Sequence, residues 1–147
     1  MICLCFSSEI RKYKNIKFKD AYDYYDKESE ISKEDIKVLM IYCHSPLWMD
    51  NWFRKNSKNK HIVDDFILEK EDILKFKQFC LEVIESGHEN YDSITCHFCF
   101  SLDLERKTRE EETYRINKVL KDIIKELDII LEDDFDNNSF IFSSYLY

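Results

Sequence analysis

The near absence of glycine and proline is the feature that most constrains the fold of this chain. Its 147 residues include one glycine, Gly87, and one proline, Pro46. Loops that bind phosphate through backbone amides need several glycines where the backbone approaches the ligand, so dinucleotide-binding loops and P-loops are excluded. The two residues also mark boundaries. Pro46 suits the first position of a helix, and Gly87 suits the position just after a helix ends.

Length and composition predict one globular domain, residues 1–147. A chain of this size buries enough surface for a proper core, and 44% hydrophobic residues are too many for intrinsic disorder. The apolar N-terminal stretch at 2–6 has no preceding basic region and is too short for a signal peptide, and no later stretch reaches membrane-spanning length. Six cysteines without a secretory signal are typical of reduced thiols. We therefore expect a cytoplasmic protein with no membrane association.

Hydrophobic periodicity predicts the order of the elements. Alternation indicates strands at 2–6, at 16–19 as an edge or surface strand, and most clearly at 93–104, while a continuous apolar run indicates a central strand at 37–43. Apolar residues at helical spacing predict helices over 46–55, 70–86 and 108–131, and 20–33 is a loop or short helix. A last strand follows at 140–147. This pattern is typical of an α+β fold, with an antiparallel or mixed sheet of about four to five strands covered by two to three helices.

Cys96 and Cys99 have the spacing of a metal-binding or redox pair. Residues three apart on a strand point to opposite faces, so these two thiols do not chelate one ion, and we expect no metal and no cofactor. Cys43 and His44 fail as a nucleophile and base for the same geometric reason. An enzyme using His44 or His97 remains a minor alternative.

The aromatic content is high, at 15% of residues. Four residues around the end of the predicted central strand could line a pocket that stacks a nucleotide base: Tyr42, His44, Trp48 and Trp52. Core packing is the alternative explanation for most of the aromatic side chains.

The charge is distributed unevenly. Residues 1–60 carry 12 Lys and Arg against 9 Asp and Glu, whereas residues 61–147 carry 10 against 21. Such an acidic surface repels nucleic acid and favours basic partners. The candidate partner-binding residues lie on the last predicted helix and just after it: Glu110, Glu111, Asp122, Glu126, Asp128, Asp133, Asp134 and Asp136. A solvated face that only keeps the protein soluble is the alternative.

Several landmarks occur in the order found in a group of small phage proteins. They are an aromatic strand at 38–43, the pair Trp52-Phe53 with Asn56, the segment 76–83, the run 98–100 and the tail 142–145. The chain resembles small uncharacterised accessory proteins of tailed phages and prophages of low-GC bacteria, although Cys43-His44-Ser45 stands where that group carries Trp-Arg-Lys. The resemblance implies a viral or mobile-element origin and an action against host defences.

Two functions are therefore expected. The first is a stoichiometric inhibitor of a host defence system, anti-CRISPR-like, whose acidic and aromatic face binds a basic nucleic-acid-binding surface on a host protein or ribonucleoprotein effector, without binding nucleic acid directly. The alternative is a ligand-binding module that sequesters a signalling nucleotide in the aromatic pocket around His44, Trp48 and Trp52.

Overall fold

The computed structural model describes residues 6–43, 48–57, 65–86 and 109–146. The described strands form one antiparallel four-stranded sheet in the order β2-β1-β4-β3. The strands are β1 (Phe6–Tyr13), β2 (Ile36–Cys43), β3 (Asp65–Leu68) and β4 (Ser139–Leu146). The described helices are α1 (Ala21–Lys27), α2 (Trp48–Asn56), α3 (Lys70–Ser86) and α5 (Arg109–Leu131). The predicted α+β class is confirmed.

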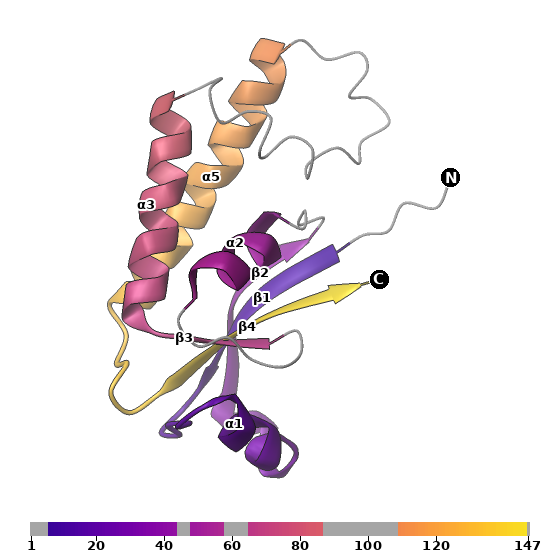
Figure 1. Ribbon diagram of the computed structural model, residues 1–147, viewed down its shortest axis with the longest axis vertical. Coiled ribbons are helices and arrows are strands. Elements are labelled where there is room, and N and C mark those ends of the chain that lie inside the picture. Colours follow the sequence, from indigo (N-terminus) through magenta and orange to yellow (C-terminus); the bar gives the residue numbers. More distant parts are fainter. Residues whose placement is uncertain (1–5, 44–47, 58–64, 87–108, 147) are drawn as a thin grey trace.

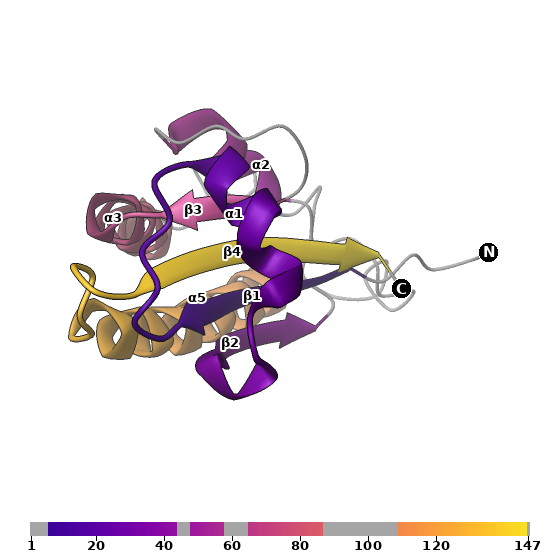
Figure 2. The ribbon, with the colours of Figure 1, turned by 90° about the horizontal axis from the view of Figure 1, so that it is seen from below.

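The helices lie on both faces of the sheet. Helices α2, α3 and α5 cover one face, with α3 and α5 side by side, and α1 crosses the other face (Figures 1 and 2). Two short 3-10 helices, Glu28–Glu30 and Lys33–Asp35, connect α1 to β2. The sheet is therefore the middle of three layers, and its two faces carry two separate cores.

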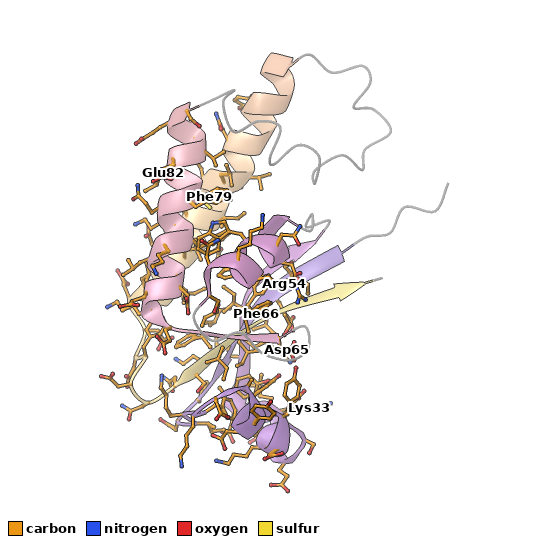
Figure 3. The ribbon with its side chains drawn as sticks, viewed as in Figure 1. Lys33, Arg54, Asp65, Phe66, Phe79 and Glu82 are labelled. Carbon is orange, nitrogen blue, oxygen red and sulfur yellow. The ribbon has the colours of Figure 1, made fainter. Side chains whose placement is uncertain are left out.

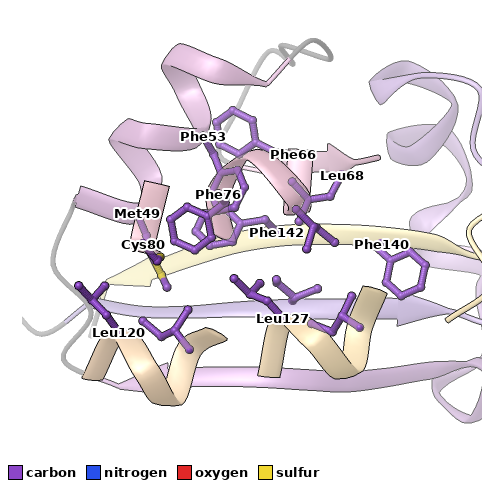
Figure 4. Packing of buried hydrophobic residues seen from close by; sticks show 14 of the residues in the cluster. Met49, Phe53, Phe66, Leu68, Phe76, Cys80, Leu120, Leu127, Phe140 and Phe142 are labelled. Carbon is purple, nitrogen blue, oxygen red and sulfur yellow. The ribbon is translucent and has the colours of Figure 1, made fainter. Parts of the chain in front are cut away.

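The larger core fills the space between the sheet and helices α2, α3 and α5 (Figure 4). The Phe142 ring, fully buried on β4, lies 4.5 Å from the Phe53 ring of α2 and 6.2 Å from the Phe66 ring of β3. Side chains from all three helices complete it: Met49, Ile73, Phe76, Cys80, Val83, Leu120, Ile123, Leu127 and Ile130. The apolar spacing that predicted the helices at 70–86 and 108–131 is the spacing of these buried residues.

The smaller core lies under α1. The Tyr24 ring of α1 contacts the Tyr13 ring of β1 at 5.8 Å and the Phe18 ring at 5.2 Å, both edge to face. Ile67 and Ile141 complete the buried set from β3 and β4. Two carboxylates cap the N-terminus of α1: the Asp20 side chain accepts from the Asp23 amide, and the Asp23 side chain accepts from the amide of Lys19, the residue before the N-cap.

Several sequence predictions are confirmed. Helix α3 has the predicted bounds, the long helix is described from Arg109 to Leu131, and the last strand begins one residue earlier than predicted, at Ser139. The predicted helix at 46–55 is α2, described from Trp48 to Asn56. The segment predicted as a loop or short helix contains α1 and the two 3-10 helices.

Other predictions are wrong. Residues 16–19 form no strand, because they belong to a loop in which Phe18 is buried against Tyr13 and Tyr24. The predicted central strand, β2, lies at an edge of the described sheet. Strand β3 was not predicted, and the first strand, predicted at 2–6, is described as β1 from Phe6 to Tyr13.

The remaining predictions are not tested, because their residues lie outside the described part of the chain. They are the strand at 93–104 with Cys96 and Cys99, the cap at Gly87, the helix start at Pro46 and residues 2–5 of the first strand.

Candidate functional site

A polar cluster lies on the sheet face that α1 covers. The register of the sheet places Glu9 and Asp65 on either side of Ser143. Arg11 lies two residues after Glu9 on β1 and therefore points to the same face of the sheet. Figure 3 shows why β3 contributes to both faces: Phe66 points toward α2, and its neighbour Asp65 points toward α1. This alternation brings an arginine, two carboxylates and a serine together beside Tyr24.

Four of these side chains form a closed hydrogen-bonded ring, which we call the Arg11 ring: Arg11, Tyr24, Asp65 and Ser143. The Arg11 Nη2 donates to Ser143 Oγ at 2.7 Å and to Tyr24 Oη at 3.1 Å. Both hydroxyls then donate to one carboxylate, Ser143 to Asp65 Oδ1 at 2.6 Å and Tyr24 to Asp65 Oδ2 at 3.4 Å. Each hydroxyl therefore accepts from the cation and donates to the anion, an arrangement in which the bonds polarise one another.

Charged and aromatic side chains surround the Arg11 ring. Glu9 Oε1 lies 3.3 Å from Arg11 Nε, and the guanidinium stands 5.9 Å from the Tyr13 ring centroid. Burial raises the pKa of Tyr24, and the hydrogen bond with Tyr13 raises it further. Burial is also the main cause of the raised pKa of Tyr13. Both phenols therefore remain protonated at neutral pH and can act as hydrogen-bond donors.

The Arg11 ring has a structural role. Ser143 is fully buried, and its hydroxyl already accepts one hydrogen bond and donates another, so it has no access to a substrate carbonyl or phosphate. The ring instead ties α1 to three strands, through Tyr24 on one side and β1, β3 and β4 on the other. Sequence reasoning missed all four residues because each comes from a different element.

The predicted acidic residues occupy three different environments. Asp128 pairs with Lys77 of α3, and both carboxylate oxygens of Asp133 accept from Lys12 Nζ at 2.8 Å. Asp134 shapes the turn after α5 by accepting from the Asn137 side chain and from two backbone amides, contacts that lower its pKa. Asp122, Glu126 and Asp136 are exposed and form no ion pair with another described residue. Glu110 and Glu111 lie in the first turn of α5, and their side chains are outside the described part of the structure.

An exposed aliphatic side chain lies among the acidic residues at the end of α5. Ile129 is 65% exposed, although its neighbours Ile130 and Leu127 are buried. Glu126 and Glu132, three residues before and after it, are exposed on the same side of the helix. The sequence does contain a signal for this arrangement, because Ile129 falls outside the apolar stripe while every other isoleucine with a described side chain in α5 falls on it. We call Asp122, Glu126, Ile129 and Glu132 the acidic ridge.

Of the four residues of the predicted nucleotide pocket, the structure describes only the side chain of Trp52. The Trp52 ring packs at 5.1 Å from the Phe76 ring and 5.9 Å from the Phe79 ring, so it forms part of the larger core. His44 and the side chains of Tyr42 and Trp48 lie outside the described part of the chain. The only cysteine thiol that the structure describes, Cys80, is buried in the same core and forms no disulfide, and burial raises its pKa to about 12.

Within residues 6–43, 48–57, 65–86 and 109–146, no three His, Cys, Asp or Glu side chains are arranged to hold a metal ion. None of the helices described there combines the length and the apolar character needed to cross a membrane. No family model, curated protein or solved structure matches this chain.

Proposed function

We propose that this protein is a stoichiometric inhibitor whose acidic ridge on α5 binds a basic nucleic-acid-binding surface of another protein. The observation that carries the proposal is the exposure of Ile129 in an acidic surrounding. A partner can desolvate this exposed aliphatic side chain, while the carboxylates around it select a basic surface.

The charges of the ridge are available to a partner. Asp122 and Glu126 form no ion pair with any other described residue, so both carboxylates can pair with the cations of a partner. Lys and Arg side chains that normally donate hydrogen bonds to nucleic-acid phosphates can donate to carboxylates in the same positions. Binding of this kind blocks the nucleic acid by occupancy and requires no catalytic group on the inhibitor.

The proposed target class follows from the phage resemblance of the sequence. Host-defence effectors that handle nucleic acid carry extended basic grooves, and a small acidic protein made in the same bacterial cytoplasm can fill one. The proposed activity is therefore anti-defence and anti-CRISPR-like. It uses no cofactor and no direct contact with nucleic acid.

Affinity capture with matched variants tests this proposal. The immobilised protein is exposed to lysate of a low-GC bacterium at increasing salt, and captured proteins are assayed for nucleic-acid binding with and without the soluble protein. I129A and D122K/E126K each change the ridge at exposed positions, so folding is expected to be unaffected. The matched controls lie on α3: L74A, at a 48% exposed leucine, and E82K/E85K, with the same change in charge.

We expect a captured protein that binds nucleic acid, loses that binding when the inhibitor is added, and is released by salt. I129A and D122K/E126K should each weaken capture by about tenfold or more, whereas the α3 controls should retain it. Capture that is insensitive to salt, or equally weakened by the α3 controls, contradicts the proposal.

A further inference from the structure

The exposed surface of α5 carries charges of both signs. The acidic ridge lies along one flank, and exposed lysines lie beside it, one of them, Lys125, between Asp122 and Glu126 in the sequence. Lys118, Lys121 and Lys125 are all exposed, and spacings of three and four residues place them on one side of the helix. In a chain with a net charge of −8, this is a local concentration of positive charge.

Four described side chains in this region line a hollow of about 300 Å³: Tyr114, Asn117, Lys118 and Lys121. Positions 114, 117, 118 and 121 follow the i, i+3, i+4, i+7 spacing of one helix face, so successive helical turns present all four to the same hollow. Tyr114 is 73% exposed, so its ring is accessible to a ligand. Neither lysine forms an ion pair with another residue in the described ranges, so both ammonium groups are available.

The three kinds of group in the hollow match the three parts of one ligand. Two ammonium groups can bind the oxygens of a phosphate through charge-assisted hydrogen bonds. An exposed phenol ring offers a flat surface on which a base can stack, and a side-chain amide supplies one donor and one acceptor for the edge of the base. The volume lies at the lower end of the range typical of small-molecule sites, which suits a single nucleotide.

We propose that this hollow binds a nucleoside monophosphate, with the phosphate at Lys118 and Lys121 and the base against Tyr114. A small ligand fits the charge layout better than a nucleic-acid strand does. Asp122 and Glu126 on the adjoining flank would repel the neighbouring phosphates of a polymer, whereas one phosphate at the lysines avoids them. The site shares no residue with the acidic ridge and does not depend on the inhibitor function.

Calorimetric titration with defined ligands tests the proposal. The full chain is titrated with AMP, GMP, CMP and UMP, and separately with adenosine and inorganic phosphate. The variants are K118Q/K121Q, which removes both charges, and Y114L, which removes the ring. The matched control is K70Q/K75Q, which removes two exposed lysines from α3. All these positions are exposed, and circular dichroism checks that each variant is folded.

We expect saturable binding of at least one of the four nucleotides with a stoichiometry near one. K118Q/K121Q should weaken it by about tenfold or more, as should Y114L, while K70Q/K75Q should leave it unchanged. Y114L should also leave any binding of inorganic phosphate unchanged, since the ring contacts only the base.

Three results would overturn the proposal. They are the absence of saturable binding for all four nucleotides up to about 1 mM, an equal loss in K70Q/K75Q, and tighter binding of a single-stranded oligonucleotide than of any mononucleotide. Titration of I129A separates the two proposed activities, because that variant should bind nucleotide normally even when it has lost its protein partner.

Discussion

Replacing Ser143 by alanine is expected to destabilise the protein more than its small size suggests. The hydroxyl is fully buried and links two charged groups, Arg11 at 2.7 Å and Asp65 at 2.6 Å. Hydrogen bonds to charged partners contribute about 1.5–3 kcal/mol each, and removal of a shared hydroxyl weakens both.

The remaining contacts of Arg11 and Asp65 limit the loss of stability in S143A. Arg11 keeps its contacts with Tyr24 and Glu9, and Asp65 is only partly buried, so water can replace part of what its carboxylate loses. We therefore expect S143A to lower the free energy of unfolding by about 2–3 kcal/mol. For a domain of this length, that corresponds to a fall in Tm of roughly 5–10 °C.

Tyr24 occupies the parallel branch of the Arg11 ring, but its contacts are longer, at 3.1 Å to Arg11 and 3.4 Å to Asp65. Y24F should therefore cost less, about 1–1.5 kcal/mol. The two hydroxyls connect the same cation to the same anion, so the double variant removes every described hydrogen-bonded link between them. Its cost should exceed the sum of the single costs by about 0.5–1 kcal/mol.

Urea unfolding of the two single variants and the double variant, followed by circular dichroism, measures these values. S144A is the control, because the Ser144 hydroxyl is half-buried on the same strand and, among the described residues, bonds only the neutral hydroxyl of Ser8, at 3.1 Å. It should cost no more than about 1 kcal/mol. Two outcomes would contradict this role of the Ser143 hydroxyl: S143A no more destabilising than S144A, or single-variant losses that add to within about 0.3 kcal/mol in the double variant.

Three further predictions concern stability. The folded state raises the pKa of Cys80, Tyr13 and Tyr24, so the unfolded chain loses these protons at lower pH than the folded chain does. The free energy of unfolding is therefore unaffected by these groups below about pH 9 and falls as the pH rises further. Urea midpoints at pH 8, 9.5 and 11 should show this fall, with each group contributing up to about 1.4 kcal/mol per pH unit above its unfolded pKa. F142A should cost about 3–5 kcal/mol in the same assay, because its ring is fully buried against two others; a loss below about 1 kcal/mol would contradict the packing. Asn15 has φ of 57°, so N15G should be nearly neutral in thermal unfolding, whereas N15V should cost roughly 1–2 kcal/mol; equal effects would rule out the backbone explanation.

The sequence predicts those parts of the fold in which one periodicity decides the structure. Helix α3 has its predicted bounds because Ile73, Phe76, Cys80 and Val83 recur at helical spacing and all four are buried. The prediction fails where a short pattern has two explanations. Phe18 alternates with lysines as a strand residue would, but an extended loop that passes under α1 gives the same alternation.

The Arg11 ring could not be predicted from local sequence. Arg11 and Ser143 are 132 residues apart, and they meet only because β1 pairs with β4 in one particular register. Asp65 belongs to a four-residue strand that is too short to show a period, and Tyr24 reaches the ring from a helix on another layer. Such a cluster depends on strand register and layer packing, which bring together residues that are far apart in the sequence.

The composition of the second half of the chain does not predict the charge of α5. The helix carries six acidic and five basic residues, so its net charge is close to zero although the second half of the chain is strongly acidic. The helical period separates these charges, placing Lys118 and Lys121 on one side and Asp122 and Glu126 on the adjoining flank. The two proposed ligands therefore have opposite charge and serve as controls for each other. K118Q/K121Q should leave capture of a basic protein intact. D122K/E126K should leave nucleotide binding intact or tighten it, because it replaces two negative charges beside the phosphate with two positive ones. A loss of both activities in either variant would mean that the face of α5 acts as one surface, and neither assignment would stand.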